Sequence, residues 1–303
     1  MESIASVKGK GWLKDLPDFR DNNPSTGHLT IGQKARGVKH PVNEILSKIQ
    51  KTKDAASITN IDLRKWCSPI EDQGQLGSCT ANAGVGLYEY FERRAFGKYI
   101  DGSRLFLYKV TRNLLGWTGD SGAYLRTSMA AMALFGIVPE KYWPYVIQRF
   151  DDEPTAFLYS YAQSYQALTY YRLDTVGVTK HHLLESIKEH IANGLPLIFG
   201  FTCYSSIGLA DDGKIPFPDP NENVEGGHAV MAVGFDDTMQ ISNPGNQNNT
   251  TTGAIMIKNS WGTEWGEHGY GWLPYEYILR GIAVDWWSMT KAEWIDTNQF
   301  GLK

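Results

Sequence analysis

The chain has 303 residues, of which 42 % are hydrophobic and 20 % are charged. This composition is typical of a soluble globular protein, and the length predicts about two domains. The 29 basic and 33 acidic residues give a net charge of −4. No nucleic-acid or membrane partner is expected, because a slightly acidic chain is not attracted to anionic surfaces and no apolar run reaches the roughly 18 residues of a membrane span.

Three cysteines, Cys67, Cys79 and Cys203, are too few for a disulfide framework and lack the spacing of a zinc site. Two buried free thiols at Cys67 and Cys203 are predicted, with one bridge between them as the alternative. The first 14 residues contain no apolar core of the kind a secretory signal needs. A cytoplasmic location is therefore favoured, and secretion stays open as the alternative.

The first part of the chain, residues 1–57, is polar and rich in turn residues. Only residues 42–49 have helical spacing of apolar side chains. Such a segment cannot bury much apolar surface alone. It is expected to be a flexible tail, a strap over the main body or a pro-segment.

Helices are predicted mainly in the first half of the globular part, each bounded by capping residues. They run from Cys79 to Phe96 before Gly97, from Arg104 to Asn113 after Ser103, from Tyr124 to Phe135 before Gly136, and from Thr179 towards Gly194.

Short β-rich runs follow later, separated by glycine, proline and asparagine. They cover residues 196–204, 228–235 and 254–258, with weaker candidates at 269–273 and 282–286. Helices first and strands later predict an α+β fold rather than an alternating parallel sheet. We expect an N-terminal extension (1–57), a mainly helical subdomain (58–175) and a mainly β subdomain (176–303).

The stretch from Gln73 to Cys79 places a thiol after a glycine-containing loop and at the start of a predicted helix. Unpaired backbone N–H groups at a helix start favour the thiolate form. The side-chain amide of Gln73 can donate a hydrogen bond to a developing oxyanion. Cys79 is thus the candidate nucleophile and Gln73 the candidate oxyanion donor.

Two later segments offer the partners that a thiolate nucleophile needs. His228 opens an apolar strand after two glycines, and Asn259 follows another strand within Lys-Asn-Ser-Trp-Gly. An imidazole can hold the ion pair and protonate a leaving amine, and an amide oxygen can fix the ring plane and tautomer. These residues lie far from Cys79 in the sequence, so only the fold can assemble the site.

These three segments resemble the papain-like cysteine peptidases, which carry Q-G-x-C-G-S-C, a glycine- or aspartate-preceded His-Ala, and N-S-W-G-x-x-W-G motifs. The resemblance covers about residues 58 to 290. It implies a two-subdomain fold with a β-rich, barrel-like half and a cleft between the halves. On this match Cys79 is the nucleophile, His228 the acid/base, Asn259 its orienting partner, and Gln73 with the N–H of Cys79 the oxyanion hole.

The resemblance also implies substrate-binding residues and some departures. Trp261 would shield the histidine–asparagine pair and form a wall on the leaving-group side. Leu76 stands where most members have a disulfide-forming cysteine, which makes a reducing compartment tolerable. Gly122 and Ala123 lie where the family has a glycine pair that hydrogen-bonds the substrate backbone. The first 57 residues do not show the long helical pro-region of plant and lysosomal members.

Asp285 matches the floor of the main specificity pocket, S2, on the same resemblance. An acidic floor would favour a basic side chain at the P2 position of the substrate. The alternative is an acid that is paired structurally or caps a turn.

The predicted function is a cysteine peptidase that hydrolyses peptide bonds of a peptide or protein substrate through a thioester, as a monomer and without a metal or cofactor. The N-terminal segment is expected to act as an intramolecular inhibitor, as in a zymogen. Two alternatives stay open: an acyl transferase that uses the same thioester, and a catalytically inactive papain-like binding protein.

Overall fold

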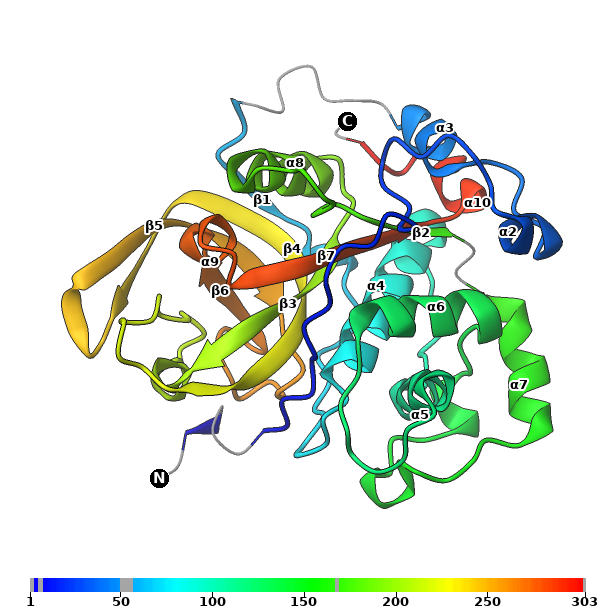
Figure 1. The fold of residues 1–303 in the computed structure, drawn as a ribbon, viewed down its shortest axis with the longest axis horizontal. Helices are drawn as coiled ribbons and strands as arrows, with labels where there is room; N and C mark the ends of the chain where they lie inside the picture. The colour runs from blue at the N-terminus through cyan, green and yellow to red at the C-terminus, as the bar shows by residue number, and fades with distance from the viewer. Residues whose placement is uncertain (1–2, 5–7, 50–56, 167–168, 302–303) are drawn as a thin grey trace.

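The computed structural model describes residues 3–4, 8–49, 57–166 and 169–301. Residues 50–56 of the predicted extension lie outside the described parts. A group of helices and an antiparallel sheet lie side by side, and the sheet carries further helices on its surface (Figure 1). In the described part of the chain, no helix is both long enough and apolar enough to cross a membrane.

The helices are α2 (Ile31–Ala35), α3 (Val42–Ser47), α4 (Cys79–Phe96), α5 (Arg104–Leu115), α6 (Leu125–Phe135), α7 (Ala156–Ala162), α8 (Lys180–Ala192), α9 (Tyr275–Leu279) and α10 (Ala292–Ile295). The strands are β1 (Asn60–Asp62), β2 (Thr169–Arg172), β3 (Leu197–Tyr204), β4 (Val224–Asn243), β5 (Asn246–Lys258), β6 (Tyr270–Pro274) and β7 (Ala283–Thr290).

The capping residues act as the sequence predicts. Gly97 ends α4 in the left-handed conformation with φ of 70°. The side chain of Ser103 accepts the N–H of Phe106 at the start of α5, and that of Thr179 accepts the N–H of His182 at the start of α8. The predictions of these helices and their capped ends are confirmed.

The sheet is antiparallel and its strands follow the order β2-β7-β3-β4-β5-β6, with β1 paired to β4. The two ends of this order do not join, so the sheet is open rather than closed into a barrel. Strand β4 is much longer than the predicted run at 228–235, because it continues into a long hairpin with β5.

The sheet also draws on residues from the range predicted to be mainly helical. Strand β1 pairs with β4, and β2 pairs with β7. In the other direction, α10 near the C-terminus packs against α4, where Trp294 stacks on Phe91 with ring centroids 5.1 Å apart. Each half therefore contains elements from the sequence range assigned to the other.

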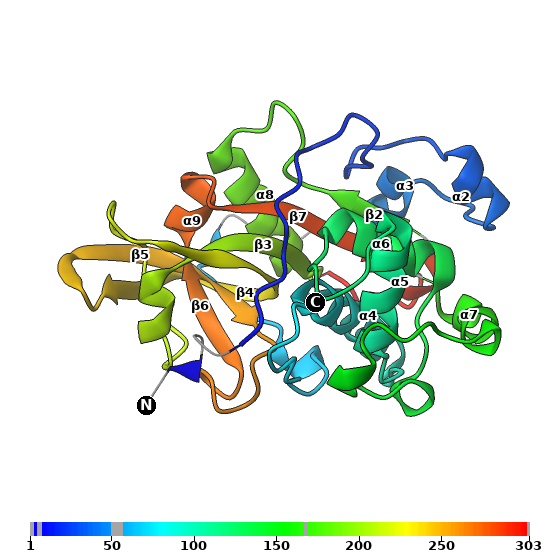
Figure 2. The same cartoon turned by 60° about the horizontal axis from the view of Figure 1, so that its bottom comes forward.

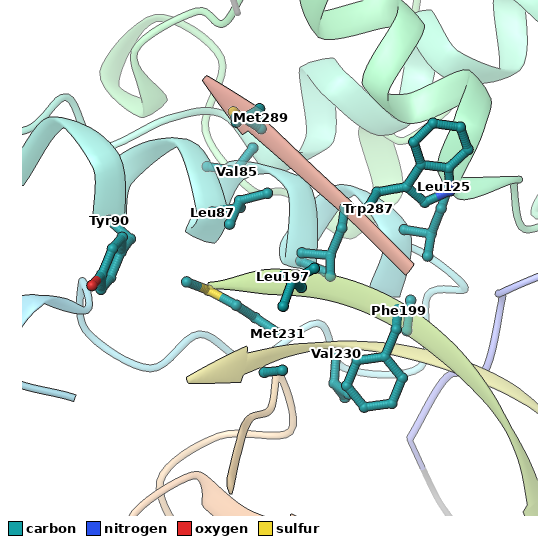
Figure 3. Close-up of a cluster of buried hydrophobic side chains, with 14 of the residues drawn as sticks. Val85, Leu87, Tyr90, Leu125, Leu197, Phe199, Val230, Met231, Trp287 and Met289 are labelled. Carbon is teal, nitrogen blue, oxygen red and sulfur yellow. The ribbon is translucent and has the colours of Figure 1, made fainter. Parts of the chain in front are cut away.

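Helix α4 forms the centre of the core between the two halves. Its residues Val85 and Leu87 lie among side chains of β3, β4 and β7, including Leu197, Met231 and Met289, all fully or almost fully buried (Figure 3). Because α4 begins at Cys79, this packing fixes the thiol at the edge where helices and sheet meet.

The N-terminal segment passes in an extended form along the line between the sheet and the helices (Figures 1 and 2). We call residues 8–13 the strap. Within the strap, Trp12 is only 4 % exposed, so this polar segment is anchored by one large apolar side chain.

Candidate active site

Cys79 is the first residue of α4, and its side chain is fully buried. Burial raises the pKa of the thiol, while nearby backbone N–H groups of Ala229, Gly11 and Thr80 act in the opposite direction. Gly11 belongs to the strap, so the strap itself contributes to the surroundings of the thiol.

His228 lies in β4, and its Nε2 is 2.7 Å from Oδ1 of Asn259, the residue that follows β5. Oδ1 of Asn259 also accepts the backbone N–H of Ser260 at 2.8 Å. This oxygen is therefore an acceptor, and Nε2 of the ring carries the proton that it donates. Nδ1 has no hydrogen-bond partner among the described residues, so it is the nitrogen left to exchange a proton.

The imidazole of His228 is completely buried. Burial lowers its pKa to about 4, opposed by the hydrogen bond that the ring donates to Asn259 and reinforced by the nearby Lys10 of the strap. The raised thiol pKa and the lowered imidazole pKa both act in favour of the neutral forms of Cys79 and His228.

Trp261 covers the ring of His228. The two rings are stacked, with centroids 4.4 Å apart and planes 24° apart, and the indole is buried. The sequence places Trp261 two residues after Asn259, and the fold turns it over the pair that Asn259 makes. It thus excludes water from the histidine–asparagine hydrogen bond.

The side chain of Gln73 is fully buried, and two backbone carbonyls accept hydrogen bonds from its amide. Its Nε2 donates to the carbonyls of Leu76 at 2.8 Å and of Gly9 at 3.0 Å. Its Oε1 accepts the hydroxyl of Ser260 at 2.6 Å, which fixes the orientation of the amide. The sequence argument missed Ser260, although the residue stands next to Asn259 in the Asn-Ser-Trp-Gly segment.

The strap covers this site and forms backbone hydrogen bonds with both halves of the molecule. The N–H groups of Gly9, Trp12 and Leu13 donate to the carbonyls of Gly74, Gly227 and Ala123, and the carbonyl of Gly11 accepts from the N–H of Ala123, over distances of 2.8–3.1 Å.

Two glycines allow the strap to come this close. A Cβ at Gly9 would lie 2.3 Å from the carbonyl oxygen of Leu76, and one at Gly11 would lie 1.9 Å from that of Gly77. Both distances are far below van der Waals contact, so these positions accept only glycine. Their partners are more than 60 residues away, and no local pattern in the sequence could indicate this.

Gly122 and Ala123 both touch the strap but in different ways. Both backbone groups of Ala123 bond to the strap: its N–H donates to the carbonyl of Gly11, and its carbonyl accepts the N–H of Leu13. The N–H of Gly122 is taken by the hydroxyl of Tyr108 at 3.0 Å, and a Cβ there would lie 2.2 Å from the carbonyl oxygen of Gly11. Gly122 thus provides space, and Ala123 provides the hydrogen-bonding edge.

Asp285 is fully buried in β7, and its Oδ2 accepts the indole N–H of Trp12 at 3.1 Å. Cys67 and Cys203 are buried free thiols. Within the described ranges, no group of three or more histidine, cysteine or acidic side chains is arranged to hold a metal ion.

Comparisons with known proteins agree on one family. The model of the papain family cysteine proteases matches residues 58–283. An uncharacterized peptidase C1-like protein of Acanthamoeba polyphaga mimivirus is 35 % identical over 296 residues, covering 95 % of this chain and 88 % of that protein. Cathepsin K of Gallus gallus is 32 % identical over 221 residues, 69 % of this chain and 57 % of that protein.

Among solved structures, xylellain, a cysteine protease from Xylella fastidiosa, superimposes with a TM-score of 0.70 at 30 % identity. The match covers 96 % of this chain and 98 % of that one. It therefore includes the N-terminal segment as well as the two halves of the body.

Proposed function

The chain belongs to the papain family of cysteine proteases, and from this premise we propose that Cys79 hydrolyses peptide bonds through a thioester and that the strap holds the enzyme closed. The observation that carries the catalytic part is the buried hydrogen bond between His228 and Asn259, together with the backbone N–H of Ala229, the residue after His228, next to the thiol of Cys79 at the start of α4. It leaves one ring nitrogen of His228 without a partner among the described residues.

In the proposed reaction the thiolate of Cys79 attacks the peptide carbonyl carbon, and a C–S bond forms. The carbonyl oxygen becomes an oxyanion that receives hydrogen bonds from Nε2 of Gln73 and the backbone N–H of Cys79. When the C–N bond breaks, protonated His228 gives its proton to the leaving amine. His228 then takes a proton from water, whose oxygen attacks the thioester, and the acid product leaves as the thiolate re-forms.

The strap supports the inhibitory part of the proposal because it already occupies the groups that a substrate would use. Nε2 of Gln73 donates a hydrogen bond to the carbonyl of Gly9. Both the N–H and the carbonyl of Ala123 are bonded to the backbone of the strap. Cys79 and His228 are left with no exposed surface. A substrate can enter only after the strap leaves.

Electrostatics adds to this steric block. The reactive form of a cysteine–histidine pair is thiolate and imidazolium, and burial beneath the strap disfavours both charges. The strap therefore keeps the pair in its unreactive, neutral form. Removing the strap admits water and restores the conditions under which the ion pair forms.

The test uses the full chain with Gly11→Ala, because an added methyl group cannot fit against Gly77 and should displace the strap. In this background Cys79→Ala is expected to abolish cleavage of a peptide substrate, whereas Cys67→Ala, at a buried thiol outside the site, should leave it nearly unchanged. Peptide cleavage that persists in the Cys79→Ala chain would refute the assignment. Transfer of the acyl group to an added amine in place of water would identify an acyl transferase.

A further inference from the structure

The indole of Trp12 occupies a slot between two neighbouring strands. A Cβ at Gly200 in β3 would lie 1.9 Å from the indole ring, and one at Gly227 in β4 would lie 2.8 Å from it. Both walls of the slot therefore depend on the absence of a side chain. The space they leave has the flat shape of an aromatic ring.

Asp285 closes the end of this slot. Its φ of 66° is rare for a residue other than glycine, and its carboxylate is fixed by surrounding donors. Oδ1 accepts the indole N–H of Trp287 at 2.7 Å and lies 3.2 Å from the guanidinium of Arg172. Oδ2 accepts the indole N–H of Trp12.

The backbone around Asp285 is held in place by a second carboxylate. Asp174 accepts the backbone N–H groups of Asp285 and Trp286, at 2.8 and 2.9 Å. It also forms a two-point ion pair with Arg172, at 2.9 and 3.0 Å. Asp285 thus remains in position when the strap leaves, because its other contacts come from the body of the enzyme.

Once the strap leaves, Oδ2 is the carboxylate oxygen at the floor that a ligand can reach. Oδ1 of Asp285 accepts the indole N–H of Trp287 and lies at ion-pair distance from Arg172, so a guanidinium entering the slot would meet a carboxylate whose charge is already paired, with only Oδ2 in the slot. An ammonium group has three donors to satisfy and a guanidinium five, whereas an indole has one. Burial raises the pKa of Asp285 to about 7, with Arg172 and the two indoles acting in the opposite direction.

We propose that this slot, walled by Gly200 and Gly227 and closed by Asp285, selects a tryptophan side chain of the peptide substrate, and that Trp12 is its built-in occupant. The inference rests on the proposed peptidase function and names its substrate class. It differs from the preference for a basic side chain that the family resemblance implies, because Arg172 and Trp287 already contact the carboxylate of Asp285.

The first test changes the occupant within the full chain and needs no peptide turnover. Iodoacetamide at pH 8.5 modifies Cys79 only when the strap opens, and mass spectrometry separates this site from Cys67 and Cys203. Trp12→Phe should raise the modification rate about tenfold, since a hydrogen bond to a charged group is lost. Trp12→Arg should raise it at least as much. An arginine variant that stays as slow as the native chain would overturn the proposal.

A double-mutant cycle separates the hydrogen bond from the shape of the ring. Asp285→Asn tolerates the left-handed backbone and removes the charge. Trp12→Phe should then raise the modification rate less in the Asp285→Asn chain than in the native one. Equal effects in both backgrounds would show that Asp285 does not recognise the indole.

The second test measures kcat/KM of the Gly11→Ala chain on peptides that differ only in the residue entering the slot. Tryptophan should exceed 3-benzothienylalanine, which has the same shape without the N–H, about tenfold. A higher value for arginine than for tryptophan would overturn the proposal. A chain that cleaves none of these peptides would refute the peptidase function instead, while the modification rates still report on the slot.

Discussion

The amide of Gln73 is held by the hydroxyl of Ser260, which accounts for the direction of its N–H groups. Without that hydroxyl the amide can rotate and present its oxygen to the oxyanion. In the Gly11→Ala chain, Gln73→Ala should lower kcat by about 10²- to 10³-fold. Ser260→Ala should lower kcat by about tenfold with little change in KM, because it loosens the orientation of a group that acts in the transition state.

The control for this pair is Ser242→Ala, at an exposed serine in the β4–β5 hairpin whose hydroxyl lies 2.8 Å from that of Thr250. Steady-state kinetics should find it unchanged. A Ser260→Ala chain with native kcat would show that Gln73 is oriented without this hydrogen bond.

The pKa of the His228 imidazole offers a test of whether the strap keeps water from the site. With a pKa of about 4 against an ordinary value of 6.5, the buried ring favours the closed state fully above pH 6.5. This contribution is lost as the pH falls from about 6.5 to 4, because protonation favours a solvated ring. The pKa of Asp285 is raised rather than lowered, so its contribution changes with pH in the opposite sense. The pH dependence of strap opening therefore does not report on His228 alone.

A titration of the His228 ring followed by NMR reports on this residue alone. The NMR pKa of His228 should be about 4 in the native chain and clearly higher in the Gly11→Ala chain, where water reaches the ring. Equal values in the two chains would mean that the strap does not desolvate the site.

Among the elements, α6 holds the segment that continues from the strap. Arg126 pairs with Asp15 at 2.8 Å and with Asp21 at 2.9 Å, and donates to the carbonyl of Leu16 at 2.6 Å. Its side chain is 26 % exposed, so these contacts are partly shielded from solvent. They fix the chain just after Trp12 to the helical half.

Arg126→Gln should therefore loosen the strap and raise the iodoacetamide modification rate of Cys79 by roughly tenfold, with a smaller difference at high salt. Arg149→Gln removes an exposed pair with Asp152 and serves as the control. If both variants react at the native rate, the ion pairs of Arg126 do not contribute to closure.

The elements that the sequence predicts well are those with local signals. Gly97, Ser103 and Thr179 mark helix ends through contacts within one turn, and the structure has them there. Strand β2 and helix α7 were missed, because both are short and depend on partners distant in the sequence.

At the scale of the whole molecule, the motifs predict that Cys79, His228 and Asn259 form one site, and the structure joins His228 to Asn259 at 2.7 Å. They could not predict what covers them. The glycines of the strap, the walls of the slot at Gly200 and Gly227, and the pairing of Asp285 with Arg172 all arise from contacts over long sequence separations. The sequence offered Asp285 either as the floor of an acidic pocket or as a structurally paired acid, and in the fold its carboxylate is paired with Arg172 and accepts the indole N–H of Trp12.

The central claim is that a complete peptidase site is closed by its own N-terminal strap, and comparing Gly11→Ala with Gly32→Ala tests it most directly. A methyl group at Gly11 meets backbone atoms of Gly77, whereas one at Gly32 in α2 meets only the end of the Arg36 side chain at 3.5 Å. We predict that Gly11→Ala raises kcat/KM on a small peptide by about tenfold or more and that Gly32→Ala leaves it unchanged. A folded Gly11→Ala chain that cleaves no faster than the native one would contradict the account.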